Sequence, residues 1–272
     1  MKTPKKSNRD YLTVTVPFAA TRAVEPPPKQ QWAHPLVWTE SMLKTLLERK
    51  VRGGKWHTLY DKVLSERNLS VSAMKVIDKQ GAAGVDRQTV DEFWATHTEQ
   101  LATLREELQT ETYRPLPVRR VEIPKPGSSE TRGLGIPTVR DRVVQTALLH
   151  VLEPIYDISF HERSFGFRRG VGCIDALRCV EELLNKGYVY VVDADLRSYF
   201  DTIPRDRLLA LLQQKVSDSA VIRLIKKYLD QEIMSALGSW TPEAGVPQGA
   251  VLSPMLSNIY LNPLDHLIAE QG

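Results

Sequence analysis

The chain has 272 residues, of which 42% are apolar and 25% charged, the balance of an ordinary globular protein. Two cysteines exclude a disulfide framework and a cysteine-based zinc site, and no apolar run is long enough to span a bilayer. The net charge of +3 does not indicate a nucleic-acid partner, although residues 114–142 hold seven basic side chains against three acidic ones. Because the N-terminus also lacks a signal-peptide pattern, we expect a cytoplasmic protein with no membrane partner.

The first third of the chain predicts a tail followed by helices. Residues 1–35 are expected to form a flexible tail, because Pro26-Pro27-Pro28 is incompatible with a regular helix. Apolar residues at three- and four-residue spacing then predict helices over 38–50, 56–79 and 89–110. Ser70 is a candidate helix cap. These helices by themselves indicate only a packed scaffold.

The middle of the chain predicts a basic β-hairpin over residues 118–137. Both arms alternate, Gly127-Ser-Ser-Glu130 supplies the turn, and the prolines suit strand ends or an edge. The hairpin carries Arg119, Arg120, Lys125 and Arg132.

Further helices are predicted downstream of this hairpin, the first ending before Pro154, and two loop regions separate them. The helices cover 139–152, 173–185, 204–215, 219–230 and 250–269; a Gly/Arg loop covers 161–172, and a second hairpin covers 233–247.

Residues 188–195 predict a buried strand that ends in carboxylates. Val189, Val191, Asp193 and Asp195 share one side, because side chains alternate along a strand. Two acids at the end of an apolar strand are costly unless they serve a metal or another partner. Such acids are structural or on the surface about as often as functional, so the strand alone suggests a divalent-metal site for phosphate chemistry without requiring one.

A Pro247-Gln248-Gly249 turn lies directly before the last predicted helix. The free N–H groups at a helix start and a glutamine amide suit contact with a nucleotide or nucleic acid. An isolated turn of this kind is usually only a turn. Because this turn follows the Asp195 segment, the two stretches together indicate a functional site more strongly than either does alone.

Together, the Asp195 segment and residues 245–261 resemble the reverse transcriptases encoded by bacterial group II introns. Other stretches match that family in the expected order, and the resemblance runs from about Ala73 to the last residue. These stretches are Gly81–Asp86, Tyr113–Pro126, Arg132–Pro137, Arg140–Gln145 and Ser164–Arg168. The resemblance implies an α+β, right-hand polymerase fold that is truncated. It would comprise fingers with an N-terminal helical extension over 36–187 and, over 188–272, a partial palm with an incomplete antiparallel sheet.

The resemblance also implies an activity, RNA-directed DNA polymerisation by a reverse transcriptase and maturase. The partners would be an RNA template, the intron RNA, a DNA primer and dNTPs, with Mg²⁺ as cofactor and Mn²⁺ as an alternative. Asp195 matches the catalytic, metal-binding aspartate, and the Leu196 backbone carbonyl would be a neighbouring ligand. Phe200 matches the aromatic that excludes a 2′-hydroxyl, although a plain core phenylalanine is the alternative.

The remaining matches concern the nucleotide and the RNA. Lys125 and Arg132 match the basic pair that grips the triphosphate, and Gln248 and Gly249 match the turn beside the templating base pair. Nucleic-acid contacts are expected, less strongly, at Arg119, Arg120, Arg168, Arg169 and Gly249, with Asp86, Arg140 and Arg142 on the same RNA-binding surface. Charges of this kind also occur on ordinary solvated loops. Asp193 and Asp201 are not expected to be ligands.

One departure from the family pattern limits the expected activity. The sequence contains no Tyr-Ala-Asp-Asp hairpin, so Asp195 alone cannot form a two-metal site. We therefore expect a truncated fragment, or a second chain that supplies the missing palm, and little or no polymerisation by this chain alone. The alternatives are a non-catalytic RNA-binding maturase module and an inactive truncated product.

Overall fold

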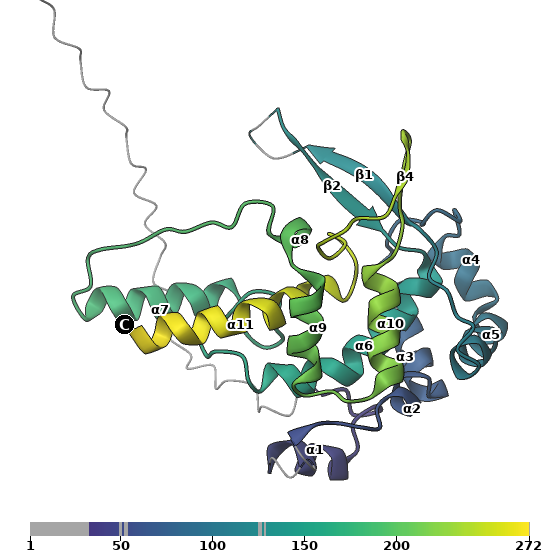
Figure 1. Cartoon of the computed structure of the whole chain (residues 1–272), viewed down its shortest axis with the longest axis horizontal. Helices are drawn as coiled ribbons and strands as arrows, with labels where there is room; N and C mark the ends of the chain where they lie inside the picture. Colours follow the sequence, from purple (N-terminus) through teal and green to yellow (C-terminus); the bar gives the residue numbers. More distant parts are fainter. Residues whose placement is uncertain (1–32, 49–50, 52–53, 125–126, 128, 272) are drawn as a thin grey trace, which may run out of the picture.

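The computed structural model describes residues 33–48, 51, 54–124, 127 and 129–271, and within them the fold is α+β (Figure 1). The helices, in chain order, are α1 (Glu40–Leu47), α2 (Tyr60–Val63), α3 (Glu66–Asp78), α4 (Val90–Ala95), α5 (His97–Gln109), α6 (Val139–Asp157), α7 (Cys173–Asn185), α8 (Tyr199–Thr202), α9 (Arg205–Gln213), α10 (Ser219–Leu229) and α11 (Ser253–Gln271). The strands are β1 (Val118–Pro124), β2 (Thr131–Ile136), β3 (Ile233–Ser235) and β4 (Gly238–Trp240). Most of the predicted tail, residues 1–32, lies outside the described residues. No described helix combines the length and apolar character needed to cross a membrane.

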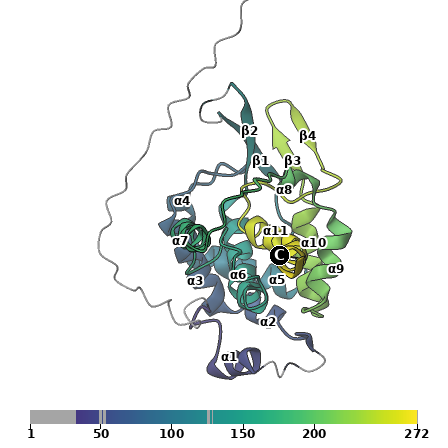
Figure 2. The same cartoon turned by 90° about the vertical axis from the view of Figure 1, so that its left-hand side faces the viewer.

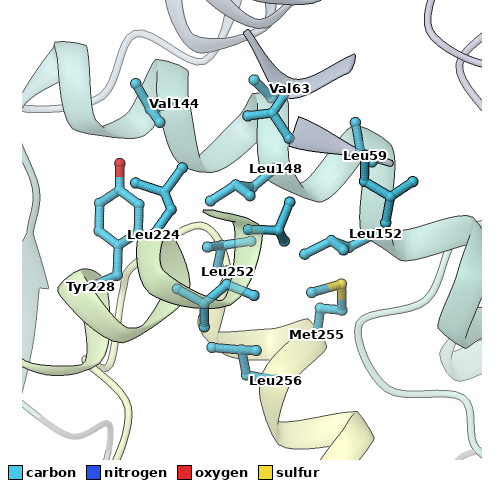
Figure 3. Packing of buried hydrophobic residues seen from close by; sticks show 14 of the residues in the cluster. Leu59, Val63, Val144, Leu148, Leu152, Leu224, Tyr228, Leu252, Met255 and Leu256 are labelled. Carbon is cyan, nitrogen blue, oxygen red and sulfur yellow. The ribbon is translucent and has the colours of Figure 1, made fainter. Parts of the chain in front are cut away.

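The hydrophobic core is built around α6, which runs through the middle of the helical part. Val144, Leu148 and Leu152 of α6 are fully buried, as expected for a helix that is apolar on most of its faces. Figure 3 shows them packed between side chains of α2 on one side and those of α10 and α11 on the other. The helical part is therefore one continuous core that supports the sheet.

The prediction that the long helix ends before Pro154 was wrong, because α6 continues to Asp157. A proline inside a helix leaves the carbonyl four residues earlier without its N–H donor. That carbonyl belongs to His150, and it accepts a hydrogen bond from Nε1 of the buried Trp38 at 2.9 Å. A residue far away in the sequence thus satisfies the group that would otherwise stop the helix.

The predicted helices over 56–79 and 89–110 are each divided in two. Ser70 lies inside α3 and caps nothing; the N-cap of α3 is Ser65, whose hydroxyl accepts from the Asn68 backbone at 3.3 Å. The second region breaks after α4, which begins at a capping box formed by Thr89 and Glu92.

The four-stranded sheet has the order β2-β1-β3-β4 and projects from one end of the helical part (Figures 1 and 2). The predicted hairpin over 118–137 is confirmed: β1 and β2 pair antiparallel from Arg119↔Ile136 to Pro124↔Thr131. The second hairpin is confirmed for β3 and β4 only, since the chain from 241 to 252 is irregular. β1 and β3 pair in parallel, which joins the two hairpins into one sheet.

The predicted buried strand over 188–195 was wrong. This segment is irregular and solvent-exposed, with Tyr190 at 95% and Val192 at 94% exposure, and it runs from α7 to α8 (Figure 1). A strand forms only where a neighbour pairs with its N–H and C=O groups. Within the described part of the chain, no strand lies beside these residues. Their alternating apolar side chains therefore bury nothing.

Replacing Asp218 with alanine is expected to destabilise the protein by about 3 kcal/mol. The variant loses a helix cap and leaves a buried backbone N–H group without an acceptor. One carboxylate oxygen accepts from Ala220 and Val221 at the start of α10, at 3.0 and 3.2 Å. The other accepts from the backbone of Leu59 and Tyr60 at 2.8 and 2.9 Å. Urea denaturation measures the effect.

The matched control is Thr39→Ala at the exposed N-cap of α1, which accepts a single bond from Met42 at 3.3 Å. We expect a loss of no more than about 1 kcal/mol there. Equal losses at the two caps would show that Asp218 does not join α10 to the α2 region.

Candidate active site

A cleft of about 950 Å³ lies between the strands β1 and β2, the segment 194–201, and the loop 242–248. We call it the first cleft. It brings together six of the candidate site residues that the sequence singled out, although they come from separate parts of the chain. They are Arg120, Arg132, Asp195, Leu196, Phe200 and Gln248.

The Pro-Gln-Gly turn is held against β2 by its backbone. Gly135 N donates to the Gln248 carbonyl at 2.7 Å, so the turn continues the edge of the hairpin. A side chain on Gly249 would lie 2.4 Å from the Gly135 carbonyl oxygen, and its φ of +103° is also one that only glycine adopts readily. The close approach of hairpin and turn therefore requires this glycine.

Gln145 of α6 supports the same turn, and sequence reasoning gave it no role. Its carboxamide oxygen accepts from the backbone of Val251 at 2.9 Å and of Leu252 at 3.4 Å, and its side chain is buried. The stretch Arg140–Gln145 was part of the family resemblance, which was the one available signal.

The short helix α8 positions Phe200 in the wall of the first cleft. Val246 N donates to the Phe200 carbonyl at 2.8 Å, which ties α8 to the loop before the turn. On the other side, the hydroxyl of Tyr199 donates to the Ser257 carbonyl of α11 at 2.7 Å, and burial raises the pKa of Tyr199. The Phe200 ring is half-buried between these anchors.

The acidic side chains of the first cleft are Asp195 and Asp201, and Asp193 is not part of its lining. Asp195 is exposed, as is Leu196 at 51%. Carboxylate and carbonyl oxygens are the ligands that Mg²⁺ prefers. Among the described residues, however, no group of three or more His, Cys, Asp or Glu side chains comes together as a metal site. The donors present fit a divalent cation in kind, although among the described residues they do not form a complete site.

The basic side chains of the first cleft are Arg120 and Arg132 of the hairpin and Arg205 of α9. The Arg132 side chain is exposed and forms no hydrogen bond or ion pair within the described part of the chain, whereas its backbone pairs with Ile123 in the hairpin. Arg120 pairs with Glu122 at 2.7 Å and lies over the Trp240 ring at 5.5 Å. The hydrogen bond from Arg120 lowers the pKa of Glu122. Lys125, the other predicted triphosphate ligand, lies outside the described residues.

Several predicted RNA-binding arginines make contacts within the protein. Arg119 donates to the Ala83 carbonyl at 3.0 and 2.6 Å, and Arg169 pairs with Glu153 at 2.9 Å. Arg168 pairs at 2.7 Å with Asp157, the last residue of α6. Nucleic-acid contacts at these arginines stay predictions.

The similarity of the chain to known proteins agrees with this geometry. Residues 123–271 match the family model described as "Reverse transcriptase (RNA-dependent DNA polymerase)". The match covers more than half of the sequence, and the chain therefore belongs to the reverse transcriptase family.

Two curated relatives show which proteins the chain is similar to. The chain is 37% identical to Protein YkfC of Escherichia coli (strain K12) over 209 residues, which are 75% of this chain and 55% of that protein. It is 33% identical to the group II intron-encoded protein LtrA of Lactococcus lactis subsp. cremoris over 214 residues, 78% of this chain and 35% of LtrA. The chain is thus a member of the reverse transcriptase family that is similar to a group II intron-encoded protein, and it spans about half of YkfC and a third of LtrA.

A solved structure supports the fold alone. The "Partial Cas6-RT-Cas1--Cas2 complex" superimposes with a TM-score of 0.53 at 23% identity, over 79% of this chain and 36% of that one. The resemblance inferred from sequence motifs and the expected α+β reverse transcriptase fold are confirmed.

Proposed function

We propose that the chain is the fingers and part of the palm of an RNA-directed DNA polymerase, and that its first cleft binds a dNTP. The observation that carries this proposal is the convergence of Arg132, Asp195, Phe200 and Gln248 in one cleft. We assign residues 36–187 to the fingers and 188–272 to the palm. The proposed partners are an RNA template, intron RNA and a DNA primer.

Each side chain of the cleft has a distinct part in this proposal. Arg132 neutralises charge on the triphosphate, and Phe200 packs under the sugar. The Gln248–Gly249 turn supports the base pair formed with the template. Asp195 and the Leu196 carbonyl would hold part of the shell of a Mg²⁺ ion, which would supply charge neutralisation for phosphoryl transfer. The other carboxylate ligands of the two-metal site would come from a part of the polymerase outside residues 1–272.

Arg132→Ala is expected to reduce ultraviolet cross-linking of radiolabelled dTTP to the chain about tenfold, in the presence of Mg²⁺ and a primer on RNA. A charge-assisted contact to phosphate contributes about 1.5–3 kcal/mol, and 1.4 kcal/mol is tenfold in affinity. Arg105→Ala is the matched control, because Arg105 is an exposed arginine of α5 outside the first cleft. Unchanged cross-linking of the Arg132→Ala chain would refute the proposed nucleotide site.

Phe200→Val is expected to let UTP compete with dTTP cross-linking, because a smaller side chain under the sugar leaves room for a 2′-hydroxyl. The competition measurement compares the concentrations of UTP and dTTP that halve the signal. We expect their ratio to fall about tenfold, within the range that one pocket contact gives. If the ratio stays the same in a chain that still cross-links dTTP, Phe200 is a core residue and not the sugar contact.

A further inference from the structure

Arg205, the first residue of α9, lines the first cleft, although the sequence analysis gave it no role. Its side chain is only 12% exposed, whereas the side chain of Arg120 in the same cleft is 39% exposed. A guanidinium keeps its charge in proteins, so burying one is costly unless its N–H groups find acceptors. The acceptors of Arg205 therefore indicate what this residue does.

The guanidinium of Arg205 donates to acceptors in two different segments. Nε donates to the Gly245 carbonyl at 3.2 Å and Nη2 to the Ala244 carbonyl at 3.4 Å. Nη1 pairs with Asp230, the C-cap of α10, at 3.4 Å. The planar fork of an arginine offers three nitrogens for such contacts, whereas a lysine offers one. Arg205 thus joins the start of α9 to the end of α10 and to the loop that precedes the Pro-Gln-Gly turn.

This loop, residues 241–246, has no helix or strand of its own and lies against α8 (Figure 1). Gly245 N donates to the Ile203 carbonyl and Val246 N to the Phe200 carbonyl, both at 2.8 Å. A side chain on Gly245 would lie 2.7 Å from the carbonyl oxygens of Phe200 and Asp201. The loop backbone is therefore packed directly against the backbone that carries the Phe200 ring.

Gly245 links these two sets of contacts. Its N–H group bonds to Ile203 at the end of α8, and its carbonyl accepts from Arg205. Because Gly245 is buried, its carbonyl would have no donor if the guanidinium were removed. The loop would then be free to move, and the hydrogen bond that it makes to Phe200 would be weakened.

The contacts of Arg205 also separate its role from that of Arg132. Each of the three guanidinium nitrogens of Arg205 already donates within the protein. The Arg132 side chain is exposed and makes no such contact within the described residues. Arg132 is therefore suited to bind a phosphate, and Arg205 is suited to hold the wall of the cleft in place.

We propose that Arg205 is a positioning residue for sugar selection: it fixes the loop 241–246 against α8 and thereby holds the Phe200 ring where it excludes a 2′-hydroxyl. Arg205 does not contact the nucleotide and acts only through the loop and Phe200. This inference rests on the proposed function, because it takes Phe200 as the residue beneath the sugar of a bound dNTP.

The test measures how well UTP and dTTP compete with cross-linking of radiolabelled dTTP, with Mg²⁺ and a primer on RNA. Arg205→Met keeps the apolar length of the side chain and removes every donor. It should lower the ratio of the UTP and dTTP concentrations that halve the signal about fivefold, within the range of one pocket contact. Arg205→Lys keeps one donor nitrogen and should lower the ratio only about twofold. Because the ratio does not depend on how much of the protein is folded, a loss of stability alone would leave it unchanged.

Two further variants make the test specific. Arg207→Ala is the matched control, because Arg207 is an exposed arginine of α9 outside the lining of the first cleft, and its ratio should be unchanged. The double variant Arg205→Met with Phe200→Val should have the same ratio as Phe200→Val alone. Two residues that act through one ring are not additive.

An unchanged ratio for Arg205→Met, an equal fall for Arg207→Ala, or additive effects in the double variant would each overturn this inference. If Arg205→Met does not fold, Arg205→Lys carries the test, and an unchanged ratio there has the same consequence. Failure here is distinct from failure of the proposed function. A fall in the ratio for Phe200→Val but not for the Arg205 variants refutes the role of Arg205 alone, whereas normal cross-linking of Arg132→Ala refutes the nucleotide site.

Discussion

Asp195→Asn will reduce RNA-templated DNA synthesis on the order of a thousandfold or more once the missing carboxylates are supplied. Asparagine keeps the size and an oxygen of the side chain but loses the charge that neutralises a divalent cation. Such charge stabilisation contributes several kcal/mol to phosphoryl transfer, and each 1.36 kcal/mol is tenfold in rate. Because Asp195 is exposed in the first cleft, the substitution should lower the rate of DNA synthesis without lowering the stability of the fold.

Primer extension by a chimera measures this effect. The 272 residues would be followed by the corresponding C-terminal part of LtrA, and the unmodified chimera provides the reference activity. The matched control is Asp193→Asn, which lies two residues earlier in the same exposed segment and outside the lining of the first cleft. Asp195→Asn should leave RNA binding intact. An active Asp195→Asn chimera, or equal loss from both substitutions, would contradict the assignment.

Gly249→Ala is the second large effect, with an expected destabilisation of about 3 kcal/mol and loss of dTTP cross-linking. The new Cβ would meet the Gly135 carbonyl oxygen at 2.4 Å and the Leu134 side chain at 2.7 Å, in a backbone conformation that alanine rarely adopts. Overpacking and backbone strain each cost about 1–3 kcal/mol. The turn must move away from β2, which opens the first cleft.

Urea denaturation and cross-linking on the folded protein measure the two parts of this prediction. Gly238→Ala is the matched control: Gly238 also has a positive φ, +134°, but nothing lies within 4 Å of its added Cβ. It carries the backbone strain without the clash and should keep normal cross-linking. If the two variants behave alike, the contact between turn and hairpin does not shape the site.

The features that could be predicted from sequence depend on near neighbours in the chain. The β1–β2 hairpin follows from alternation and a turn, both local properties of residues 118–137. The failed strand over 188–195 has the same local pattern, yet a strand also needs a partner that local pattern cannot supply. Pro154 was misjudged for a similar reason, because the hydrogen bond that compensates for it comes from Trp38.

In the candidate site, too, some features could be predicted from the sequence and others depend on how the chain folds. The family resemblance selected Arg132, Asp195 and Gln248, and the structure places all three in one cleft. Periodicity alone suggested only a carboxylate pair, Asp193 and Asp195, on a strand that does not form. Reading charge along the chain cannot reveal that Arg168 faces Asp157, nor that Lys75 lines a second cleft. The first depends on how the loop after α6 folds back on that helix, and the second on packing between distant segments.

The most direct test of the nucleotide site is amide-resolved NMR of the chain titrated with dTTP and Mg²⁺, with template and primer present. We predict shifts confined to residues around the first cleft, notably Gly133, Gly135, Leu196 and Gln248, all in its lining or next to the turn. Replacing Mg²⁺ with Mn²⁺ should broaden the signals nearest Asp195. Saturable shifts elsewhere in the protein, or none at all, would contradict the account.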